Sequence, residues 1–555
     1  MSIGANVLIL RSASLILLSV LLVSCTFFDD GDDRTAEPGT QEGTGSRFST
    51  NDPIERACAL EKEILLRIWR GHRDDNSEDV TTVPLEPNYA GSFNITSHSG
   101  PWDYLQRVPL VLYGPETIKA QGQPLREKAS IVDVYPTVGE LADVSLPPRD
   151  GRVLDEAIDD DRSESPKLIL TIMWDGVGRN VLERWPEAWP TLRRMEREGT
   201  SYVNAVVGSS PSITPATHSS LGTGAYPRKH GVTAIEYRDD TGNVNTAFAK
   251  RDPSGLDLTT FADEIDRELG NEPLAGLIGW RSWHQGMLGH GDMTPRGDHD
   301  HLGLIGFNQE LVGNDNYYST PAYLRNFPGL EDRISQLDQT DGELDGEWLG
   351  EPIAERHDNP AWINYQTDIL LALMEREGYG TDDVPDMLFT NFKMTDIVGH
   401  QYTMDSPRMK RVLRAQDAAL ARILDYLDED VSDYVVILSA DHGHTPSAER
   451  SGAWPVLQGQ LRADLGERFN IPEQDLVEQT TAVGPFLDRE VMAENEVTLE
   501  DVARFLNGYT IGDNWGEDQL PSGYEDRKDE PVFEAVWPSD SIDEVMRCAR
   551  RRAPR

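Results

Sequence analysis

Short apolar runs separated by polar, turn-rich stretches form the dominant pattern of this chain. Three of these runs, Leu168–Trp174, residues 387–391 and Tyr434–Ser439, have the length of strands and are largely aliphatic. Such runs predict buried strands. Residues 411–427 repeat apolar positions at close to helical spacing, which predicts an amphipathic helix. Strands that alternate with such helices predict an α/β fold with a mostly parallel sheet.

Acidic residues and histidines follow the three runs closely. Asp175 directly follows the first run, and Asp396 with His400 follows the second. Asp441 and His442 come just after the third. In an open parallel sheet the site lies beyond the carboxyl ends of the strands, so side chains from distant parts of the chain can converge there. Carboxylates and imidazoles together are typical metal ligands, and the pattern predicts a metal site.

Thr214 lies at the predicted start of a helix. It is followed by Pro215 and a stretch compatible with a helix, which predicts that Thr214 caps the helix with proline at its first position. Its hydroxyl would then lie at the positive end of the helix, where a phosphate oxyanion is also favoured. Residues 222–231 follow as a turn-rich stretch.

Together these motifs resemble the alkaline phosphatase superfamily, and most closely its type I phosphodiesterase/nucleotide pyrophosphatase branch. In the order that the family uses, they are Trp174-Asp175-Gly176, Thr214 to His218 with Gly222-Thr223-Gly224 and Tyr226-Pro227…His230-Gly231, Asp396…Gly399-His400, and Asp441-His442-Gly443. Each motif alone is weak, but four in order are specific. The resemblance implies an alkaline-phosphatase-like sheet flanked by helices, with a cap subdomain, and a metal-dependent phosphoric ester hydrolase.

One element of the family is missing from its usual place. The resemblance calls for a histidine near the carboxyl end of the domain, yet no histidine follows His444. Residues 98–104, 108–115, 133–137 and 151–154 are similar to that closing element, and they begin with His98. The chain is therefore predicted to be circularly permuted. The ancestral ends would be joined across about residues 158–166, with new ends opened between roughly residues 538 and 89.

The resemblance also implies two zinc ions, with another divalent metal as the alternative. The first would be held by Asp175, Asp441, His442 and the oxygen of Thr214, and the second by Asp396, His400 and His98. Two metals about 4 Å apart can bind both the attacking and the leaving oxygen of an in-line displacement. Thr214 would attack phosphorus and form a phospho-threonine intermediate that water then hydrolyses.

The sequence motifs say less about which phosphate ester is the substrate. The family's asparagine three residues after the nucleophile is replaced by Thr217, while Arg281 and His284 are candidates to bind a phosphomonoester dianion. Trp280 and Trp283 would suit either stacking on a substrate ring or core packing. The expected activity is that of a phosphodiesterase or nucleotide pyrophosphatase. The alternatives are a phosphomonoesterase of the same superfamily and a surface lipoprotein that only binds. A sulfatase is disfavoured, because its nucleophile would be a modified Cys or Ser.

Three further histidines have no assigned role. His299 and His301 belong to a polar insertion that resembles a metal site, and His444 is expected to be a loop residue near the metal edge.

The amino-terminal segment predicts secretion. Residues 1–24 have one charge and a short apolar run, as in a signal peptide, and residues 22–25 resemble a bacterial lipobox that would lipidate Cys25. An ordinary cleaved signal is the alternative. The expected organisation is a signal peptide (1–24), a flexible tether (25–50), a permuted segment completing the catalytic domain (51–158) and the main domain (166–555), with a cap at about 240–380. The protein would be lipid-anchored in a bacterial cell envelope.

The cysteines and the net charge lead to two further expectations, about a disulfide and about binding partners. The permuted order would bring both chain ends together, so Cys58 and Cys548 are predicted to form a disulfide, with buried free thiols as the alternative. The formal net charge is −45, from 96 acidic and 51 basic residues. Such a charge disfavours binding to duplex nucleic acid. The expected partners are a small-molecule phosphate ester and, through the lipid anchor only, a membrane; the oligomeric state is undetermined.

Overall fold

The computed structural model describes residues 50–162, 164–239, 241–291, 300–306, 309–354, 356–431, 433–516 and 519–551. The predicted signal peptide, nearly all of the tether, Cys25 and His299 lie outside the described residues. The lipid anchor and the location in a cell envelope therefore stay predictions. Within the described ranges, no helix has the length and apolar character that crossing a membrane requires.

A nine-stranded sheet lies at the centre of the fold, in the order β11-β10-β9-β12-β5-β13-β3-β6-β4. Its strands are β3 (Leu110–Tyr113), β4 (Leu125–Ser130), β5 (Leu168–Trp174), β6 (Thr200–Val206), β9 (Ala275–Gly279), β10 (His301–Ile305), β11 (Leu311–Val312), β12 (Asp386–Phe392) and β13 (Tyr434–Ser439). Most neighbouring pairs are parallel. The predicted mostly parallel α/β fold is confirmed, and the three predicted strands are β5, β12 and β13.

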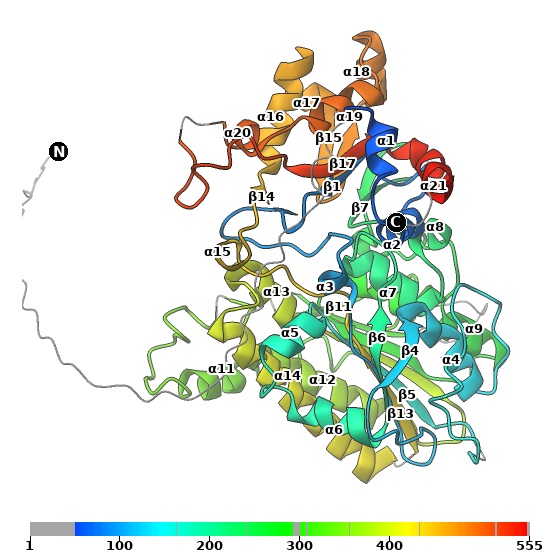
Figure 1. Cartoon of the computed structure of the whole chain (residues 1–555). Coiled ribbons are helices and arrows are strands. Elements are labelled where there is room, and N and C mark those ends of the chain that lie inside the picture. Colours follow the sequence, from blue (N-terminus) through cyan, green and yellow to red (C-terminus); the bar gives the residue numbers. More distant parts are fainter. Residues whose placement is uncertain are drawn as a thin grey trace, which may run out of the picture. The chain divides into compact units, whose positions relative to one another are not determined.

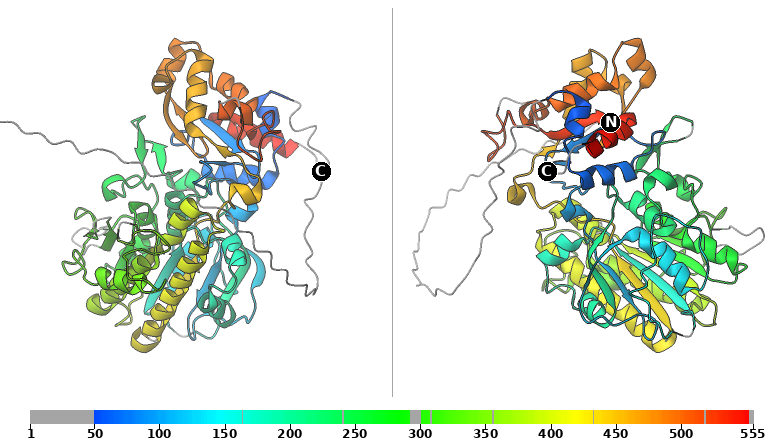
Figure 2. Two further views of the ribbon diagram at one scale, coloured as in Figure 1. Left: turned by 90° about the vertical axis from the view of Figure 1, so that its left-hand side faces the viewer. Right: turned by 45° about the vertical axis from the view of Figure 1, so that its right-hand side comes forward.

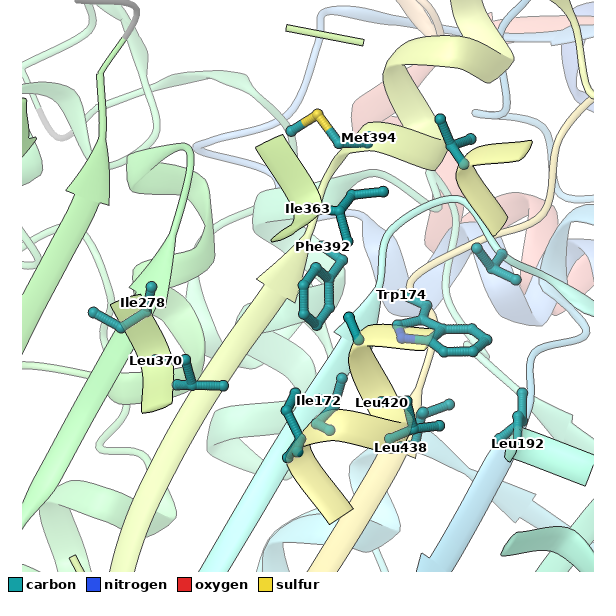
Figure 3. Packing of buried hydrophobic residues seen from close by; sticks show 14 of the residues in the cluster. Ile172, Trp174, Leu192, Ile278, Ile363, Leu370, Phe392, Met394, Leu420 and Leu438 are labelled. Carbon is teal, nitrogen blue, oxygen red and sulfur yellow. The ribbon is translucent and has the colours of Figure 1, made fainter. Parts of the chain in front are cut away.

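Alternate residues of β5 enter two different cores. Leu170, Ile172 and Trp174 belong to one core, and Ile169 and Met173 to the other. Successive side chains of a strand point to opposite faces, so a strand that is apolar throughout must be covered on both sides. Figure 3 shows the first core, where strand residues such as Phe392 pack against helix residues such as Leu420.

Helices cover each face of the sheet (Figure 1). The first core is closed by α5 (Arg179–Arg184), α6 (Pro190–Glu198), α11 (Leu330–Asp338), α12 (Pro360–Glu377), α13 (Met394–Tyr402) and α14 (Pro407–Tyr426). The second core is closed by α4 (Val134–Leu141), α7 (Thr214–Thr223), α9 (Phe261–Glu268) and α10 (Gln285–Leu288). The helix predicted over residues 411–427 is therefore α14, which begins slightly earlier.

The direction of β3 matters for the site. β3 runs antiparallel to both of its neighbours, β13 and β6. Its first residue therefore lies at the edge of the sheet where the parallel strands end. Residues that precede β3, including His98, are brought to the same edge as the residues that follow β5, β12 and β13.

A smaller lobe combines both ends of the described chain. Figures 1 and 2 show residues 452–538 (orange to red) beside the blue segment that begins at residue 50. Its strand pairs are β1 (Val80–Pro84) with β17 (Phe533–Pro538), β2 (Tyr89–Ala90) with β14 (Pro455–Val456), and β15 (Val477–Thr481) with β16 (Gly484–Leu487). Its helices are α16 (Gln458–Phe469), α17 (Glu473–Leu476), α18 (Arg489–Glu494), α19 (Leu499–Asn507) and α20 (Ile511–Trp515).

Short elements connect these parts. They are α1 (Pro53–Ala57), α2 (Lys62–Gly71), α3 (Asp103–Gln106), α8 (Pro227–His230), α15 (Ala448–Ser451) and α21 (Ile542–Arg551), together with the hairpin of β7 (Glu236–Arg238) and β8 (Val244–Thr246). Brief 3-10 turns are η1 (Ile131–Asp133), η2 (Ala249–Arg251), η3 (Ser282–His284) and η5 (Ser539–Ser541), and a π-helical turn, η4 (Leu427–Val431), extends α14.

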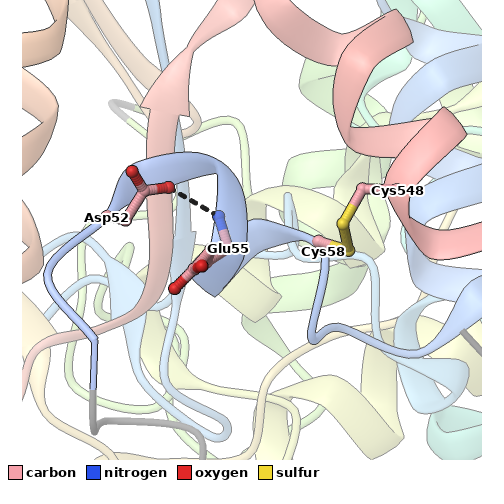
Figure 4. Close-up of a disulfide and its surroundings, with 4 residues drawn as sticks. All are labelled: Asp52, Glu55, Cys58 and Cys548. Atoms are coloured by element: carbon pink, nitrogen blue, oxygen red, sulfur yellow. Dashed lines mark hydrogen bonds between the residues drawn. A yellow bond between two sulfur atoms is a disulfide. The ribbon is translucent and has the colours of Figure 1, made fainter.

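Cys58 and Cys548 form the predicted disulfide, with their Cα atoms 5.7 Å apart. Figure 4 shows it beside α1, whose amino end is capped by the Asp52 carboxylate accepting from the Glu55 amide. The bond joins two cysteines separated by 490 positions. The loop that it closes therefore includes most of the described chain, and the bond joins the segments near its two ends.

Replacing both cysteines by serine is expected to lower the free energy of unfolding by about 2–5 kcal/mol, because the unfolded chain is no longer constrained by this long loop. Urea unfolding of the oxidised protein and of the double variant would measure the difference. The reduced protein serves as the control and should unfold like the variant. Coincident curves for all three would show that the bond contributes nothing.

Three local expectations need correction or qualification. The sequence also suggests one helix over residues 54–69, and this is wrong: α1 and α2 are separate. α1 packs mainly on β17 and α2 packs on α8, while both contact α21. Thr214 is not the N-cap of α7; Ile213 caps the helix and Thr214 is its first residue. Within residues 240–380, β9, β10 and β11 join the central sheet, so a cap over the site stays a prediction only for the rest of that range.

Candidate active site

Three buried carboxylates meet at the carboxyl edge of the sheet. Asp175 follows β5, Asp441 follows β13, and Asp396 lies in the first turn of α13, just after β12. These strands are neighbours in the order β12-β5-β13, and all three run parallel. Their carboxyl ends therefore deliver the three side chains to one place, as the sequence predicted.

Four histidines surround Asp396 Oδ1. Their Nε2 atoms lie 3.3 Å (His400), 3.6 Å (His98), 3.7 Å (His442) and 3.7 Å (His444) from that oxygen. The His98 and His442 rings stack with their centroids 3.4 Å apart. His98 thus joins the residues that the sequence assigned to the site, although it comes from the segment before β3.

The backbone orients three of these rings. His98 Nδ1 lies 2.9 Å from the Ser212 carbonyl oxygen, His442 Nδ1 lies 3.0 Å from that of Gly443, and His400 Nδ1 is paired with the Thr96 carbonyl. A carbonyl oxygen only accepts, so each Nδ1 carries the proton. Each Nε2 lone pair is then left to face the carboxylates, which is the arrangement typical of metal-binding histidines.

Burial keeps the His98, His442 and His444 rings neutral, whereas at His400 Asp396 outweighs burial and raises the pKa. Burial lowers the pKa of His98 well below its ordinary value, lowers that of His442, and lowers that of His444 to about 3. Burial alone would raise the pKa of Asp396, but Lys393 and His400 outweigh it and hold that pKa well below the ordinary value. Neutral imidazoles beside an ionised carboxylate are the protonation states that bind a metal.

Several of the facing atoms lack hydrogen-bond partners. Asp396 Oδ1, Asp441 Oδ2 and His442 Nε2 are buried without a partner of good geometry among the described residues. Their neighbours lie 3.3–3.7 Å away, close to the separation of about 3.3 Å between two ligands of one tetrahedral zinc. Unpaired buried polar atoms are costly unless something binds them. The donor set therefore fits divalent metal ions.

The residues fall into two metal-binding groups that share His442. One consists of Asp175, Asp441 and His442, and the other of His98, Asp396 and His442. His442 Nε2 lies 3.6 Å from Asp175 Oδ1 and 3.3 Å from Asp441 Oδ2. The two groups resemble the ligand sets that the sequence implied, with His442 placed between them and His400 beside the second.

Thr214 begins α7 at the edge of this cluster. Its side chain is buried, and its Oγ1 accepts a hydrogen bond of 3.0 Å from Lys393 Nζ. α7 ends at Gly224, which adopts the left-handed conformation (φ 65°) typical of a helix terminus. The hydroxyl thus lies at the amino end of a ten-residue helix, where the helix dipole favours an anion.

Lys393 is a site residue that the sequence did not suggest. Its Nζ lies 3.0 Å from Asp175 Oδ1 and 2.8 Å from Asp396 Oδ2, so it connects carboxylates of the two groups. Burial lowers the pKa of Lys393, but the three site carboxylates outweigh burial and raise it above the ordinary value. The ammonium is therefore charged at neutral pH.

A third group adjoins the first. His218 and His284 are buried with their Nδ1 atoms 3.0 Å apart, and both lie close to Asp175. Asn391 donates to Asp175 Oδ2 at 3.1 Å and lies 3.3 Å from His218 Nε2. Burial lowers the pKa of His218 to about 4, so this ring is neutral. His284, a predicted substrate residue, thus lies on the Asp175 side of the site, and its contact with substrate stays a prediction.

The other predicted substrate residues, Thr217 and Arg281, have less direct contacts with the site. The Thr217 hydroxyl is buried without a partner among the described residues. Arg281 is half-buried, and its guanidinium carbon lies 5.9 Å from the centre of the Trp283 ring, as does Lys393 Nζ. Trp280 packs edge-on against Trp362 in the core. Direct substrate contacts of Thr217 and Arg281 stay predictions.

His301 lies elsewhere in the sheet. It is the first residue of β10, which runs parallel to β9, so it is at the edge opposite the site. Its Nδ1 pairs with the Tyr379 hydroxyl at 2.9 Å. His444, expected to be a loop residue near the metal edge, is fully buried among the site histidines. Its position two residues after His442 was the only feature of the sequence that indicated a place near the site.

Comparison with known proteins agrees with this geometry. The family model described as type I phosphodiesterase / nucleotide pyrophosphatase matches residues 169–550. The chain belongs to this family. It is a metal-dependent phosphoester hydrolase of the alkaline phosphatase superfamily, as the sequence motifs implied. The match begins within β5, so residues 51–158 lie outside it and the circular permutation stays a prediction.

Several similar proteins are named alkaline phosphatases. Alkaline phosphatase PafA of Elizabethkingia meningoseptica is 21% identical over 406 residues, covering 61% of this chain and 72% of the relative. Alkaline phosphatase PhoK of a Sphingomonas species is 21% identical over 358 residues, covering 56% and 63%. A crystal structure of PafA superposes with a TM-score of 0.52 at 18% identity, covering 68% of this chain and 85% of that one. The superposition shows a shared fold.

Proposed function

We propose that this family member hydrolyses phosphate esters through Thr214 as nucleophile, with two divalent metal ions, expected to be zinc, as cofactors. The observation that carries the proposal is the position of Thr214. Its buried hydroxyl lies at the amino end of α7, hydrogen-bonded to a lysine that contacts carboxylates of both metal-binding groups.

The residues that would hold the ions are those of the two groups. Asp175, Asp441, His442 and Thr214 would hold one, and Asp396, His400 and His98 the other, with His444 beside the second. When bound, such ions supply Lewis-acid activation of the nucleophile and stabilise charge on the leaving oxygen.

The chain's own groups orient the reaction. The amino end of α7 favours a phosphoryl oxygen near Thr214, and the Lys393 ammonium favours loss of the hydroxyl proton. Attack of Thr214 Oγ1 on phosphorus would break the bond to the leaving oxygen and form a phospho-threonine. Water would then break the Thr214 Oγ1–phosphorus bond and regenerate the hydroxyl.

The ester class has two candidates. A phosphodiester or nucleotide pyrophosphate is the expectation from the sequence motifs and agrees with the family description. A phosphomonoester is the second candidate, and the specific observation that favours it is the buried Lys393 ammonium beside Thr214, a fixed positive charge. The small-molecule nature of the substrate is common to both.

Removal of metal tests the proposal. Treatment with a chelator is expected to abolish hydrolysis of both an aryl phosphomonoester and a bis-aryl phosphodiester, and zinc should restore it. Elemental analysis should find two ions per chain in the active protein. Full turnover by protein shown to contain no metal would contradict the proposal, and so would a stoichiometry below one.

A further inference from the structure

Lys393 is held by the fold at the centre of the site. It is the residue directly after β12, and its backbone caps the amino end of α13. Its side chain is only 6% exposed. A long cationic side chain is rarely buried unless it is paired, and this one is paired with Asp175 and Asp396. Its direction is thus specified by the residues proposed to bind metal.

The contact with Thr214 distinguishes this lysine from other buried cations of the protein. Arg56 donates to backbone carbonyls, and Arg179 pairs with Glu196, so both stabilise structure away from the site. Lys393 Nζ instead donates to the oxygen proposed to attack phosphorus, at 3.0 Å. An ammonium has three N–H donors, and Asp175, Asp396 and Thr214 are its three acceptors.

We infer that Lys393 is a catalytic residue that binds the transferred phosphoryl group and makes the site prefer phosphomonoesters to diesters. The inference rests on the proposed function, in which Thr214 is the nucleophile. A phosphorus atom bonded to Thr214 Oγ1 has its non-bridging oxygens within reach of a donor that already contacts Thr214. The N–H that points to the hydroxyl is then free to bind one of those oxygens.

Charge balance explains why the preference would be for monoesters. With Thr214 still protonated, the three site carboxylates and two divalent ions would together leave one positive charge, and the Lys393 ammonium would raise this to two. A phosphomonoester carries a charge of about −1.5 to −2 at pH 7, whereas a diester carries a single negative charge. The lysine therefore balances the additional charge of the monoester in a site that is shielded from water.

Arg281 and Trp283 are compatible with this role. Both cations, Arg281 and Lys393, lie 5.9 Å from the centre of the Trp283 ring. The ring is half-buried. Lys393 is nevertheless the cation for which a contact with Thr214 is seen.

Replacement of Lys393 by methionine tests the inference, because methionine keeps the length and removes the charge. We expect kcat/KM for 4-nitrophenyl phosphate to fall by about 10²–10³-fold, as when one preorganised donor is lost. For bis(4-nitrophenyl) phosphate we expect a fall of less than about tenfold. The affinity for inorganic phosphate, measured by calorimetry on the metal-loaded protein, should fall by at least about tenfold.

Two further variants complete the experiment. Lys393→Arg keeps the charge and should recover part of the preference for the monoester. Lys119→Met makes the same chemical change at a surface ion pair with Asp160 and should leave both activities unchanged. The metal content of every variant is measured alongside.

Two results would overturn the inference. Equal losses on both esters with unchanged phosphate affinity would show that Lys393 only supports the fold or the carboxylates. An additional metal ion bound by Lys393→Met would show that the ammonium takes the place of a cation instead of binding substrate. Failure of the proposed function is recognised separately, because a Thr214→Ala protein would then retain turnover. The phosphate affinity of Lys393→Met is measured without turnover, so it tests the inference on its own.

Discussion

Thr214→Ala protein is expected to lose turnover by about 10⁴-fold or more with any phosphate ester, because removal of a nucleophile leaves only binding and electrostatic contributions. The loss should not come from unfolding. The Thr214 hydroxyl makes a single described contact, with Lys393, and the helix that it begins is buried throughout. The melting temperature should therefore stay close to that of the unchanged protein, and Asp175, Asp441 and His442 remain to hold the ion that Thr214 would share.

Steady-state rates with an aryl phosphate, measured beside metal analysis, would check this expectation. Thr223→Ala is the matched control, since Thr223 is a buried threonine of the same helix whose hydroxyl donates to the Ser219 carbonyl and accepts from the Ala225 amide. Thr214→Ser should retain a measurable rate because it keeps the hydroxyl. If the alanine variant kept a tenth of the rate or more, another group would have to be the nucleophile.

His98→Ala is expected to have the second largest effect, a fall in turnover of about 10²-fold or more together with the loss of one metal ion per chain. The physical reason is its geometry: His98 Nε2 faces Asp396 at 3.6 Å while Nδ1 is bound to the Ser212 carbonyl. Loss of such an oriented ligand leaves an incomplete site. Elemental analysis and rates at several zinc concentrations would measure both effects.

The same variant tests the predicted circular permutation. His301→Ala is its control, because that histidine lies at the opposite edge of the sheet and pairs with Tyr379. Partial recovery of the His98→Ala rate at high zinc would agree with a weakened metal site. Two tightly bound ions and an unchanged rate would instead mean that the segment before β3 supplies no ligand, and the permuted assignment would fail.

The strands and the residues that follow them could be predicted because two local signals agree. Leu168–Trp174 and Tyr434–Ser439 are apolar on both faces, which few structures other than a covered parallel sheet accommodate. Asp175 and Asp441 follow them directly, so their position was specified by strand direction alone. The Cys58–Cys548 bond was also predictable, once the chain ends were expected to lie together.

The residues that were missed have no such signal. Lys393 lies between a strand and Asp396, where a lysine is usually a solvated surface residue, and its inward direction is imposed by two carboxylates from different strands. His444 lies in a loop near the metal edge, as expected, but its close packing against Gly176 and Gly399, which places it among the site histidines, has no signal in the sequence. The break between α1 and α2 also depends on tertiary packing, because α1 packs mainly on β17 and α2 packs on α8.

The sequence by itself determined the α/β class, the three strands that carry the carboxylates, the family, and the kind of chemistry. These depend on the periodicity of apolar residues and on short motifs, both of which are local in the chain. Only the tertiary structure decided that His98 reaches the site through the reversed direction of β3, that His442 lies between the two metal-binding groups, and that Lys393 contacts Thr214. Those facts depend on which segments pack together and in which direction, and side-chain direction in a closely packed interior is set by neighbours distant in the chain.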